Sequence, residues 1–461
     1  MNDDTDTTGL LTQAPADTAC TPIELLHQEA YEAFVADLSA ADRDWLLRQK
    51  FGGKPRQLAW LERDSEAVVV VAVDGKDDLN TLGHLPTQLP EGHYQLTAPA
   101  STVQLTGWGL GAYQFTRYKD ATRAPAQLLL PRDCEADKII NTVNAVQLTR
   151  DLINTPAGDM APSHLAAEAS ALADRFGAEF DMVEGDALLD LECGAIHAVG
   201  RAADDAPRLI DIQWGDPEAP KISLVGKGVT FDSGGLNLKP AGGMRSMKKD
   251  MGGAATVLGL AYLIMAQRLN VRLRVLVPAA ENAISGNAFR PGDILSTHKG
   301  LTVEIDNTDA EGRLLLCDAL SIACGDAPEL VVDYATLTGS ARSAVGAEVA
   351  AMFCNDDALA VTLGEMGVHE DDAVWRMPLH GPYNHMLESK VADLVNSAAS
   401  PYAGAITAAL FLERFVDAPS WVHFDVMAYN TRNRPGHPEG GEAMGLRAVY
   451  AHLEQTYGTS S

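Results

Sequence analysis

The apolar positions of the chain form two kinds of pattern, short β-branched runs and longer segments with helical spacing. The run AVVVVAVDG at 67–75 ends in an Asp-Gly pair, which predicts a strand followed by a turn. The stretch TVQLTGWGLGAYQF at 102–115 continues the strand-rich character, and its glycines are expected at bends or bulges. Pro22 is expected to open a helical stretch. Residues 21–135 therefore predict a small N-terminal α/β domain.

A polar, proline-containing stretch at 124–133 is typical of a domain boundary. Residues 136–156 then carry apolar positions at helical spacing and stop at a proline, which predicts a helix. We expect this connecting helix within 136–160, before a larger domain at 161–461. The first residues, 1–20, are polar and acidic and are expected to form a disordered tail.

Beyond the connecting helix the pattern becomes an alternation of strands and helices. Strands are predicted at 194–200, 208–214, 221–226, 271–278, 301–306, 329–337 and 421–427. Helices are predicted at 163–175, 254–269, 311–324 and 404–416. This alternation predicts an α/β domain with a central mixed sheet flanked by helices, the larger of two domains.

Composition narrows the classes of partner. The 461 residues are many for one hydrophobic core and suit two domains. The chain has 35 Lys and Arg against 63 Asp and Glu, a net charge of −28. A field of that sign repels phosphate backbones, so no nucleic-acid partner is expected.

The same sequence predicts a cytoplasmic protein. The N-terminus lacks the basic and apolar regions of a signal peptide, and no apolar run reaches the roughly 18 residues that a membrane span needs. No pair of the 6 cysteines has Cys-x-x-Cys spacing, so we expect reduced, mostly structural thiols.

A glycine-dense segment at 225–256 is the first candidate for chemistry. It follows a predicted strand and contains Lys227, Asp232, Lys239 and Asp250 before the next helix. Ligands of open α/β sheets bind beyond the carboxyl ends of the strands, where this loop is expected. Glycines permit the tight turns that such a loop requires.

The second candidate is DNTDAEGRLLLCDAL at 306–320, which follows the predicted strand LTVEID and is expected at the same sheet edge. Asp309, Glu311 and Arg313 have the spacing i, i+2, i+4, which puts three side chains on one face if the segment is extended. Two carboxylates and a guanidinium would then form a platform for a cation and an anion.

Four converging carboxylates would repel one another strongly unless cations neutralised them. Oxygen ligands suit Mg²⁺ and Mn²⁺, and Zn²⁺ accepts them, and two ions match this charge better than one. No His-Glu-x-x-His motif offers an alternative site. A loop Asp is, however, usually a turn or cap residue, and a loop Lys a solvated charge. Composition and spacing therefore leave both interpretations open.

The motifs NTDAEGRL at 307–314 and VGKG-x-x-FDSGG at 225–235 resemble the leucyl (cytosolic) aminopeptidase family of dinuclear metallopeptidases, in a bacterial subgroup. Similarity at VQLTRDLINTPAGDMAP and YATLTGS extends the resemblance over most of 140–430. The N-terminal region resembles the family only loosely, and 434–448 departs from its better-known members. The resemblance implies that 161–461 is a catalytic dinuclear metallopeptidase domain.

The resemblance also implies ligands for two divalent ions, Zn²⁺ or Mn²⁺ above all. One ion would be held by Lys227, Asp232, Asp250 and Glu311. The other would be held by Asp232, Asp309 and Glu311, with the carbonyl of Asp309. An amine binds a metal only when neutral, and two dications would lower the pKa of Lys227 enough for that.

The remaining roles follow from the same resemblance. Lys239 would polarise the scissile carbonyl, and Arg313 would hold a bicarbonate that acts as general base on a metal-bridging water. Met247, Thr336 and Gly339 would line the pocket for the first side chain, with a preference for leucine-like residues. The substrate would be a peptide with a free N-terminus, and the chain would assemble as a homo-hexamer.

Three alternatives remain. Clustered carboxylates with Lys and Arg also suit a two-metal phosphoesterase, although the motif pair argues against it. Some relatives of this family are DNA-bending accessory proteins, a role that the net charge of −28 disfavours. A catalytically inactive scaffold is disfavoured because every expected ligand position is filled.

Overall fold

The computed structural model describes residues 8–13 and 19–458, and its contacts divide the chain into two compact units. The first unit is formed within 1–147 together with 432–439, and the second within 148–431 together with 440–461. The helix α6 (Ala136–Asn154) begins in the first unit and ends in the second. The expected two-domain α/β organisation is confirmed. No helix in the described part of the chain is long and apolar enough to cross a membrane.

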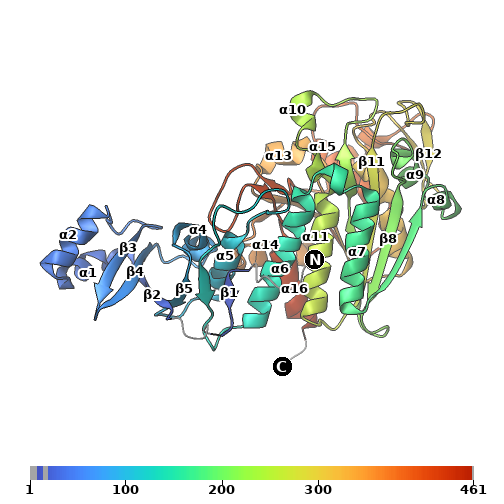
Figure 1. Ribbon diagram of the computed structural model, residues 1–461. Coiled ribbons are helices and arrows are strands. Elements are labelled where there is room, and N and C mark those ends of the chain that lie inside the picture. The colour runs from blue at the N-terminus through green and yellow to red at the C-terminus, as the bar shows by residue number, and fades with distance from the viewer. Residues whose placement is uncertain (1–7, 14–18, 459–461) are drawn as a thin grey trace. The chain divides into compact units, whose positions relative to one another are not determined.

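The first unit contains a sheet with strand order β1-β6-β5-β2-β4-β3 (Figure 1). Its strands pair in parallel except for the antiparallel pair β3–β4. The strands are β1 (Leu10–Leu11), β2 (Thr21–His27), β3 (Leu58–Arg63), β4 (Glu66–Val73), β5 (His93–Leu96) and β6 (Gln127–Leu129). The helices are α1 (Tyr31–Asp37), α2 (Ala40–Arg48), α3 (Asn80–Gly83), α4 (Leu85–Gln88) and α5 (Thr102–Ala112).

The strand predicted at 102–115 is wrong, because Thr102–Ala112 form the helix α5. Ser101 and Gln104 form a capping box at its start, which satisfies backbone N–H groups that a strand would pair laterally. A Cβ atom at Gly107 would collide with the carbonyl of Leu79, before α3, and one at Gly111 with that of Gly83. The glycines therefore permit close helix packing rather than strand bends.

Two further predictions for this unit are wrong. Pro22 does not open a helix but lies in strand β2, which pairs with β4 and β5. Leu10, within the predicted tail, lies in strand β1 and is 1% exposed because it packs into the core of the unit. Most of the remaining tail, 1–7 and 14–18, lies outside the described residues.

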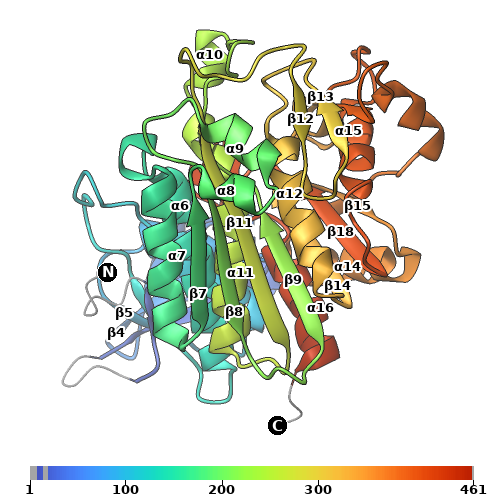
Figure 2. The ribbon, with the colours of Figure 1, turned by 90° about the vertical axis from the view of Figure 1, so that its right-hand side faces the viewer.

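The second unit is built on a mixed sheet with strand order β16-β15-β18-β14-β9-β11-β8-β7, in which β10 also pairs with β11 (Figure 2). Parallel pairing joins β18, β14, β9 and β11, and antiparallel pairing joins β15 to β18 and β8 to both β11 and β7. The strands are β7 (Glu179–Glu184), β8 (Arg208–Trp214), β9 (Lys221–Gly226), β10 (Gly228–Asp232), β11 (Arg272–Asn282), β14 (Leu330–Ala335), β15 (Ala350–Cys354), β16 (Val374–Arg376) and β18 (Ser420–Asp425).

Helices cover both faces of this sheet (Figures 1 and 2). Helices α7 (Pro162–Phe176), α11 (Gly252–Ala266) and α16 (Leu446–Tyr457) lie on one face. Helices α9 (Gly194–Gly200) and α12 (Gly312–Gly325) lie on the other. The buried side chains Val225, Leu276 and Val331 of the sheet pack against this second layer. The predicted mixed sheet flanked by helices is confirmed.

The remaining helices are α8 (Ala187–Asp190), α10 (Ala241–Met244), α13 (Gly339–Val345), α14 (Asp357–His369) and α15 (Gly404–Glu413), and the 3-10 helices include η3 (Met247–Met251). Two short sheets complete the unit, β12 (Ile294–Ser296), β13 (Thr302–Glu304) and β17 (Leu394–Val395) in one, and β19 (Tyr429–Asn430) and β20 (Gly440–Gly441) in the other.

Two strand predictions in this unit need correction. Residues 194–200 form helix α9, because the carboxylate of Asp318 accepts hydrogen bonds from Ala195 N at 3.0 Å and Ile196 N at 3.1 Å. Those backbone groups are the unpaired donors of a helix start. The strand predicted at 301–306 exists as β13, but it pairs with β12 and β17 rather than joining the central sheet.

Candidate active site

The first glycine-dense segment begins at the carboxyl edge of the central sheet. Lys227 follows β9 directly, and its backbone N–H donates to the carbonyl of Tyr334 in β14 at 3.0 Å. Strand β10 pairs with β11 in parallel and ends at Asp232. The chain later enters η3, which carries Asp250 into the start of α11. Because β9 and β14 are parallel, these side chains meet at one sheet edge.

The second segment is not extended, so the shared face predicted from the spacing i, i+2, i+4 is wrong. Asp309 lies in a turn, Glu311 is the N-cap residue of α12, and Arg313 lies in the first turn of that helix. The side chains converge because the turn folds Asp309 back toward the helix start. The spacing of residues on a strand does not describe this geometry.

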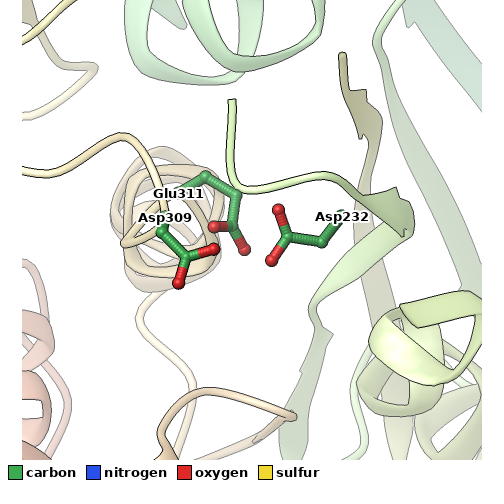
Figure 3. Close-up of side chains that lie close together, drawn as sticks. All are labelled: Asp232, Asp309 and Glu311. Carbon is green, nitrogen blue, oxygen red and sulfur yellow. The ribbon is translucent and has the colours of Figure 1, made fainter. Parts of the chain in front are cut away.

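Three carboxylates converge on one point. Asp232, Asp309 and Glu311 each offer an oxygen, and these three atoms all lie within 4.8 Å of one another. Figure 3 shows the side chains pointing toward a shared centre, from the end of β10 and from the turn before α12. Oε2 of Glu311 is buried and accepts no hydrogen bond within the described structure. This donor set and its unpaired oxygen fit a divalent cation.

Lys227 joins Asp250 to this cluster. Its Nζ lies 2.8 Å from Oδ2 of Asp250 and 2.9 Å from Oε1 of Glu311, and it donates to the carbonyl of Thr336 at 3.0 Å. Burial alone lowers the pKa of Lys227, but the negative charges of Asp250 and Glu311 outweigh burial and raise it. Lys227 is therefore protonated in this arrangement.

Lys239 bridges the other side of the cluster. Its Nζ lies 2.7 Å from Oδ2 of Asp232 and 2.5 Å from Oδ1 of Asp309. Burial lowers the pKa of Lys239, but the charge of Asp232 and the hydrogen bonds to both carboxylates raise it above its ordinary value. The ammonium group is thus held in its charged form among the carboxylates.

The crowding of charge at the cluster shifts the pKa values of its carboxyl groups. Burial, followed by the charge of Asp232, raises the pKa of Glu311 to about 8. Burial likewise raises the pKa of Asp232, with Asp250 adding to the effect. The pKa of Asp250 is lowered, because Lys227 and Lys249 outweigh the effect of burial. Such opposed shifts within one cluster are characteristic of functional sites.

Neighbouring polar groups hold these side chains in place. Asn282 donates from Nδ2 to Oδ1 of Asp232 at 2.8 Å and to the carbonyl of Thr308 at 3.0 Å. The Thr336 hydroxyl donates to Oδ1 of Asp250 at 2.7 Å. These bonds link Asp232 to β11, and Asp250 to the residue that directly follows β14, so the ends of two strands set the positions of the carboxylates.

A cavity of about 330 Å³ opens over the cluster. It is lined by all ten residues expected at the site, namely Lys227, Asp232, Lys239, Met247, Asp250, Asp309, Glu311, Arg313, Thr336 and Gly339. No described residue of 434–448, where the sequence departs from the family pattern, lines it.

Two positively charged side chains that the sequence motifs did not indicate also line the cavity. Lys249 and Arg342 line it beside the expected residues. Burial lowers the pKa of Lys249 to about 8; the charge of Asp250 opposes this shift, and that of Arg342 adds to it. Nothing in the sequence distinguishes Lys249 from its neighbour Lys248, since only the fold shows which of the two faces the cavity.

Arg313 is buried at the cavity wall. Burial lowers its pKa to about 10, while the charges of Glu311 and Asp425 oppose that shift. Its Nε atom is buried and donates no hydrogen bond within the described structure. A buried guanidinium N–H without an acceptor is costly, so this edge of Arg313 suits an oxygen ligand.

Comparison with known proteins covers both units. The model for the catalytic domain of the cytosol aminopeptidase family matches residues 147–450, and that for the N-terminal domain of M17 aminopeptidases matches 21–131. A probable cytosol aminopeptidase of Roseiflexus castenholzii is 40% identical over 362 residues, 75% of this chain and 74% of that one.

Solved structures are similar over nearly the whole chain. The crystal structure of the cytosol aminopeptidase from Coxiella burnetii is 44% identical and has a TM-score of 0.93, covering 97% of this chain and 99% of that one. The bottromycin maturation enzyme BotP in complex with Mn is 31% identical with a TM-score of 0.85, covering 95% of this chain and 100% of that chain.

Proposed function

The chain belongs to the cytosol aminopeptidase family and is a metal-dependent aminopeptidase, and on this premise we propose that it binds two divalent ions, Zn²⁺ or Mn²⁺. The observation that carries the proposal is the convergence of Asp232, Asp309 and Glu311 within 4.8 Å. Lys227 and Asp250 would complete the ligand set, with Lys227 losing its proton when the metal binds.

The bound ions would supply the acidification of a water that serves as nucleophile. The residues of the chain supply the rest of the chemistry. Lys239 keeps its proton beside Asp232 and Asp309 and can donate it as a hydrogen bond to the scissile carbonyl. That bond strengthens as negative charge develops on the oxygen, which lowers the barrier.

Arg313 is proposed to hold a bicarbonate, which would take a proton from the attacking water. The unpaired Nε atom of Arg313 supports this role, because a planar oxyanion can accept hydrogen bonds from a guanidinium edge. The anion would then stand beside the carboxylate cluster as a base.

We propose that the first residue of the peptide enters the cavity beside Met247, Thr336 and Gly339, which all line it. A free α-amine can act as a ligand near Asp250, whereas an acylated amine cannot. Fixing the amine places the first peptide bond at the cluster, so the enzyme releases single N-terminal residues.

The homo-hexameric assembly and the cytoplasmic location are proposed from the family resemblance. Light scattering after size exclusion tests the assembly, with six copies of the 49.1 kDa chain expected. A monomer with full activity would contradict it. Fractionation of the source cells tests the location.

Metal analysis with an activity assay tests the proposed function. Removal of metal by a chelator should abolish hydrolysis of aminoacyl amides, and Zn²⁺ or Mn²⁺ should restore it. Elemental analysis should give close to two ions per chain. A phosphate monoester serves as the control substrate; its hydrolysis without amide hydrolysis would instead indicate a phosphoesterase.

A further inference from the structure

Two cations face the part of the cavity that is proposed to receive the first side chain of the substrate. Lys249 lies in η3, two residues after Met247. Arg342 lies in α13, one helical turn after Gly339. Both line the same cavity as Met247, Thr336 and Gly339.

Lys249 is buried without a close partner. The residue is 1% exposed, and its Nζ lies 4.0 Å from Oδ1 of Asp250. That oxygen already accepts a hydrogen bond from Thr336 at 2.7 Å, and Oδ2 of Asp250 lies 2.8 Å from Nζ of Lys227. Within the described residues, Nζ of Lys249 donates no hydrogen bond. Because Lys249 lines the cavity, this donor is open to an acceptor that a ligand brings into it.

Arg342 adds a second donor group. Its Nη2 lies 3.7 Å from the position that a Cβ atom on Gly339 would take, so the guanidinium borders the face of Gly339. Among the described residues no carboxylate pairs with Arg342. The guanidinium offers five N–H donors in a fork that fits a carboxylate.

We propose that the cavity selects peptides whose first residue is acidic, glutamate or aspartate, with the side-chain carboxylate received by Lys249 and Arg342. The proposal rests on the proposed aminopeptidase function and replaces the expected preference for leucine-like residues. A leucine side chain would cover both cations and leave their donors unpaired, whereas a carboxylate accepts from both. Nζ of Lys249 can donate in either protonation state, so the recognition does not depend on its titration.

The comparison of glutamate with glutamine isolates the charge. The two side chains have nearly the same shape, but the amide of glutamine bears no charge and has one acceptor oxygen in place of two. A pocket that recognises charge therefore separates them, whereas a pocket that recognises size does not. A leucine substrate has a side chain of similar bulk without polar atoms, so its rate of cleavage tests whether the pocket prefers an apolar side chain.

Kinetics of the metal-loaded, full-length enzyme on Glu, Asp, Gln and Leu aminomethylcoumarin amides test the proposal. We expect kcat/KM for Glu to exceed that for Gln about tenfold or more, since hydrogen bonds to charged groups are the strong ones. Lys249→Met and Arg342→Leu should each lower the Glu to Gln ratio, and the double variant should bring it close to one.

Lys248→Met is the matched control, because it removes the same charge from the neighbouring residue. Lys248 does not line the cavity, and its Nζ donates to the carbonyl of Asn154 at 2.5 Å. This variant should keep the wild-type Glu to Gln ratio. Thermal unfolding and metal content show whether each variant is folded and loaded with metal. If Lys249→Met does not fold, the Glu to Gln ratio of Arg342→Leu alone tests the proposal, since Arg342 is only half-buried.

Two results would overturn the proposal. One is wild-type cleavage of Leu or Gln substrates as fast as Glu. The other is a Glu to Gln ratio that is unchanged in folded Arg342→Leu. Failure of the aminopeptidase function itself looks different, because the enzyme would then cleave none of the four amides with any divalent metal.

Discussion

Asp425, at the end of β18, accepts hydrogen bonds from both the backbone N–H and the hydroxyl of Thr338, at 3.1 and 2.6 Å. Its Oδ1 also accepts from the N–H of Leu337 at 3.0 Å. Thr338 in turn caps α13, and the loop that they fix carries Thr336 into the cavity. Asp425 therefore acts as a positioning residue for the cavity wall.

Replacement of Asp425 tests this positioning role. Asp425→Ala leaves the buried N–H of Thr338 unpaired, which should cost roughly 1–3 kcal/mol of unfolding free energy, and also removes the acceptor of the partly exposed N–H of Leu337. It should also lower kcat/KM, because Thr336 and α13 lose their anchor. Asp425→Asn keeps an acceptor for the N–H groups and should be milder in both respects. Denaturant unfolding gives the free energy of unfolding of both variants, and kinetics gives their kcat/KM. Equal effects of the Ala and Asn variants would contradict the positioning role.

Variants of Lys239 and Glu311 should distinguish a loss of catalysis from a loss of metal binding. Lys239→Ala removes a donor to the substrate carbonyl, so kcat should fall on the order of 10²–10³-fold while metal content is retained. Glu311→Ala removes a converging carboxylate, so both metal content and rate should fall. Elemental analysis alongside kinetics distinguishes the variants. If Lys239→Ala emptied the metal site, the role given to Lys239 would be wrong.

Acetylation of the substrate tests selection of the peptide's end. A peptide with a free N-terminus should lose its first residue, while its N-acetylated form should not react. Acetylation leaves the scissile bond unchanged but removes the lone pair of the amine and adds bulk. The rate should drop by several orders of magnitude, given the ~7–11 kcal/mol that orientation can supply. Mass spectrometry of the free and the acetylated peptide after digestion measures the difference. Cuts in the peptide interior would indicate an endopeptidase.

His84, in the N-terminal unit, predicts a pH dependence of stability. Burial lowers the pKa of its imidazole to about 4, and Nε2 has no hydrogen-bond partner in the described structure. The unfolded chain binds this proton near pH 6.5, before the folded state does. The contribution of His84 to unfolding free energy is therefore complete above about pH 6.5 and is lost as pH falls toward 4.

The variant His84→Phe removes this titration. Relative to it, the wild type should lose stability between about pH 6.5 and 4, and the difference between the two should be constant above that range. Urea unfolding of both proteins at several pH values measures the difference. A difference independent of pH across the whole range would contradict the buried neutral imidazole.

The structure brings together the residues expected at the site, although the local structure around them differs in part from the prediction. All ten expected residues line one cavity, where β9 ends and α12 begins. The extended geometry assigned to Asp309 and Glu311 was wrong all the same. Spacing alone does not distinguish a strand from a turn that caps a helix.

Two of the wrongly predicted elements depend on tertiary contacts that the local sequence pattern does not show. The glycines of helix α5 allow its backbone to pack closely against the backbone of α3 and of Leu79 before it. The start of helix α9 is stabilised by Asp318, more than 100 positions away along the chain. Lys249 and Arg342 went unnoticed for the same reason. Only the fold brings η3 and α13 to one cavity wall.

The bonds that shape the cavity wall join distant parts of the chain. Lys227 and Thr336 are 109 positions apart, and Thr338 and Asp425 are 87 apart. On the ribosome, β18 emerges well after both sequence motifs have left the exit tunnel. The part of the cavity wall that Asp425 fixes through Thr338 is therefore completed only after most of the chain has been made.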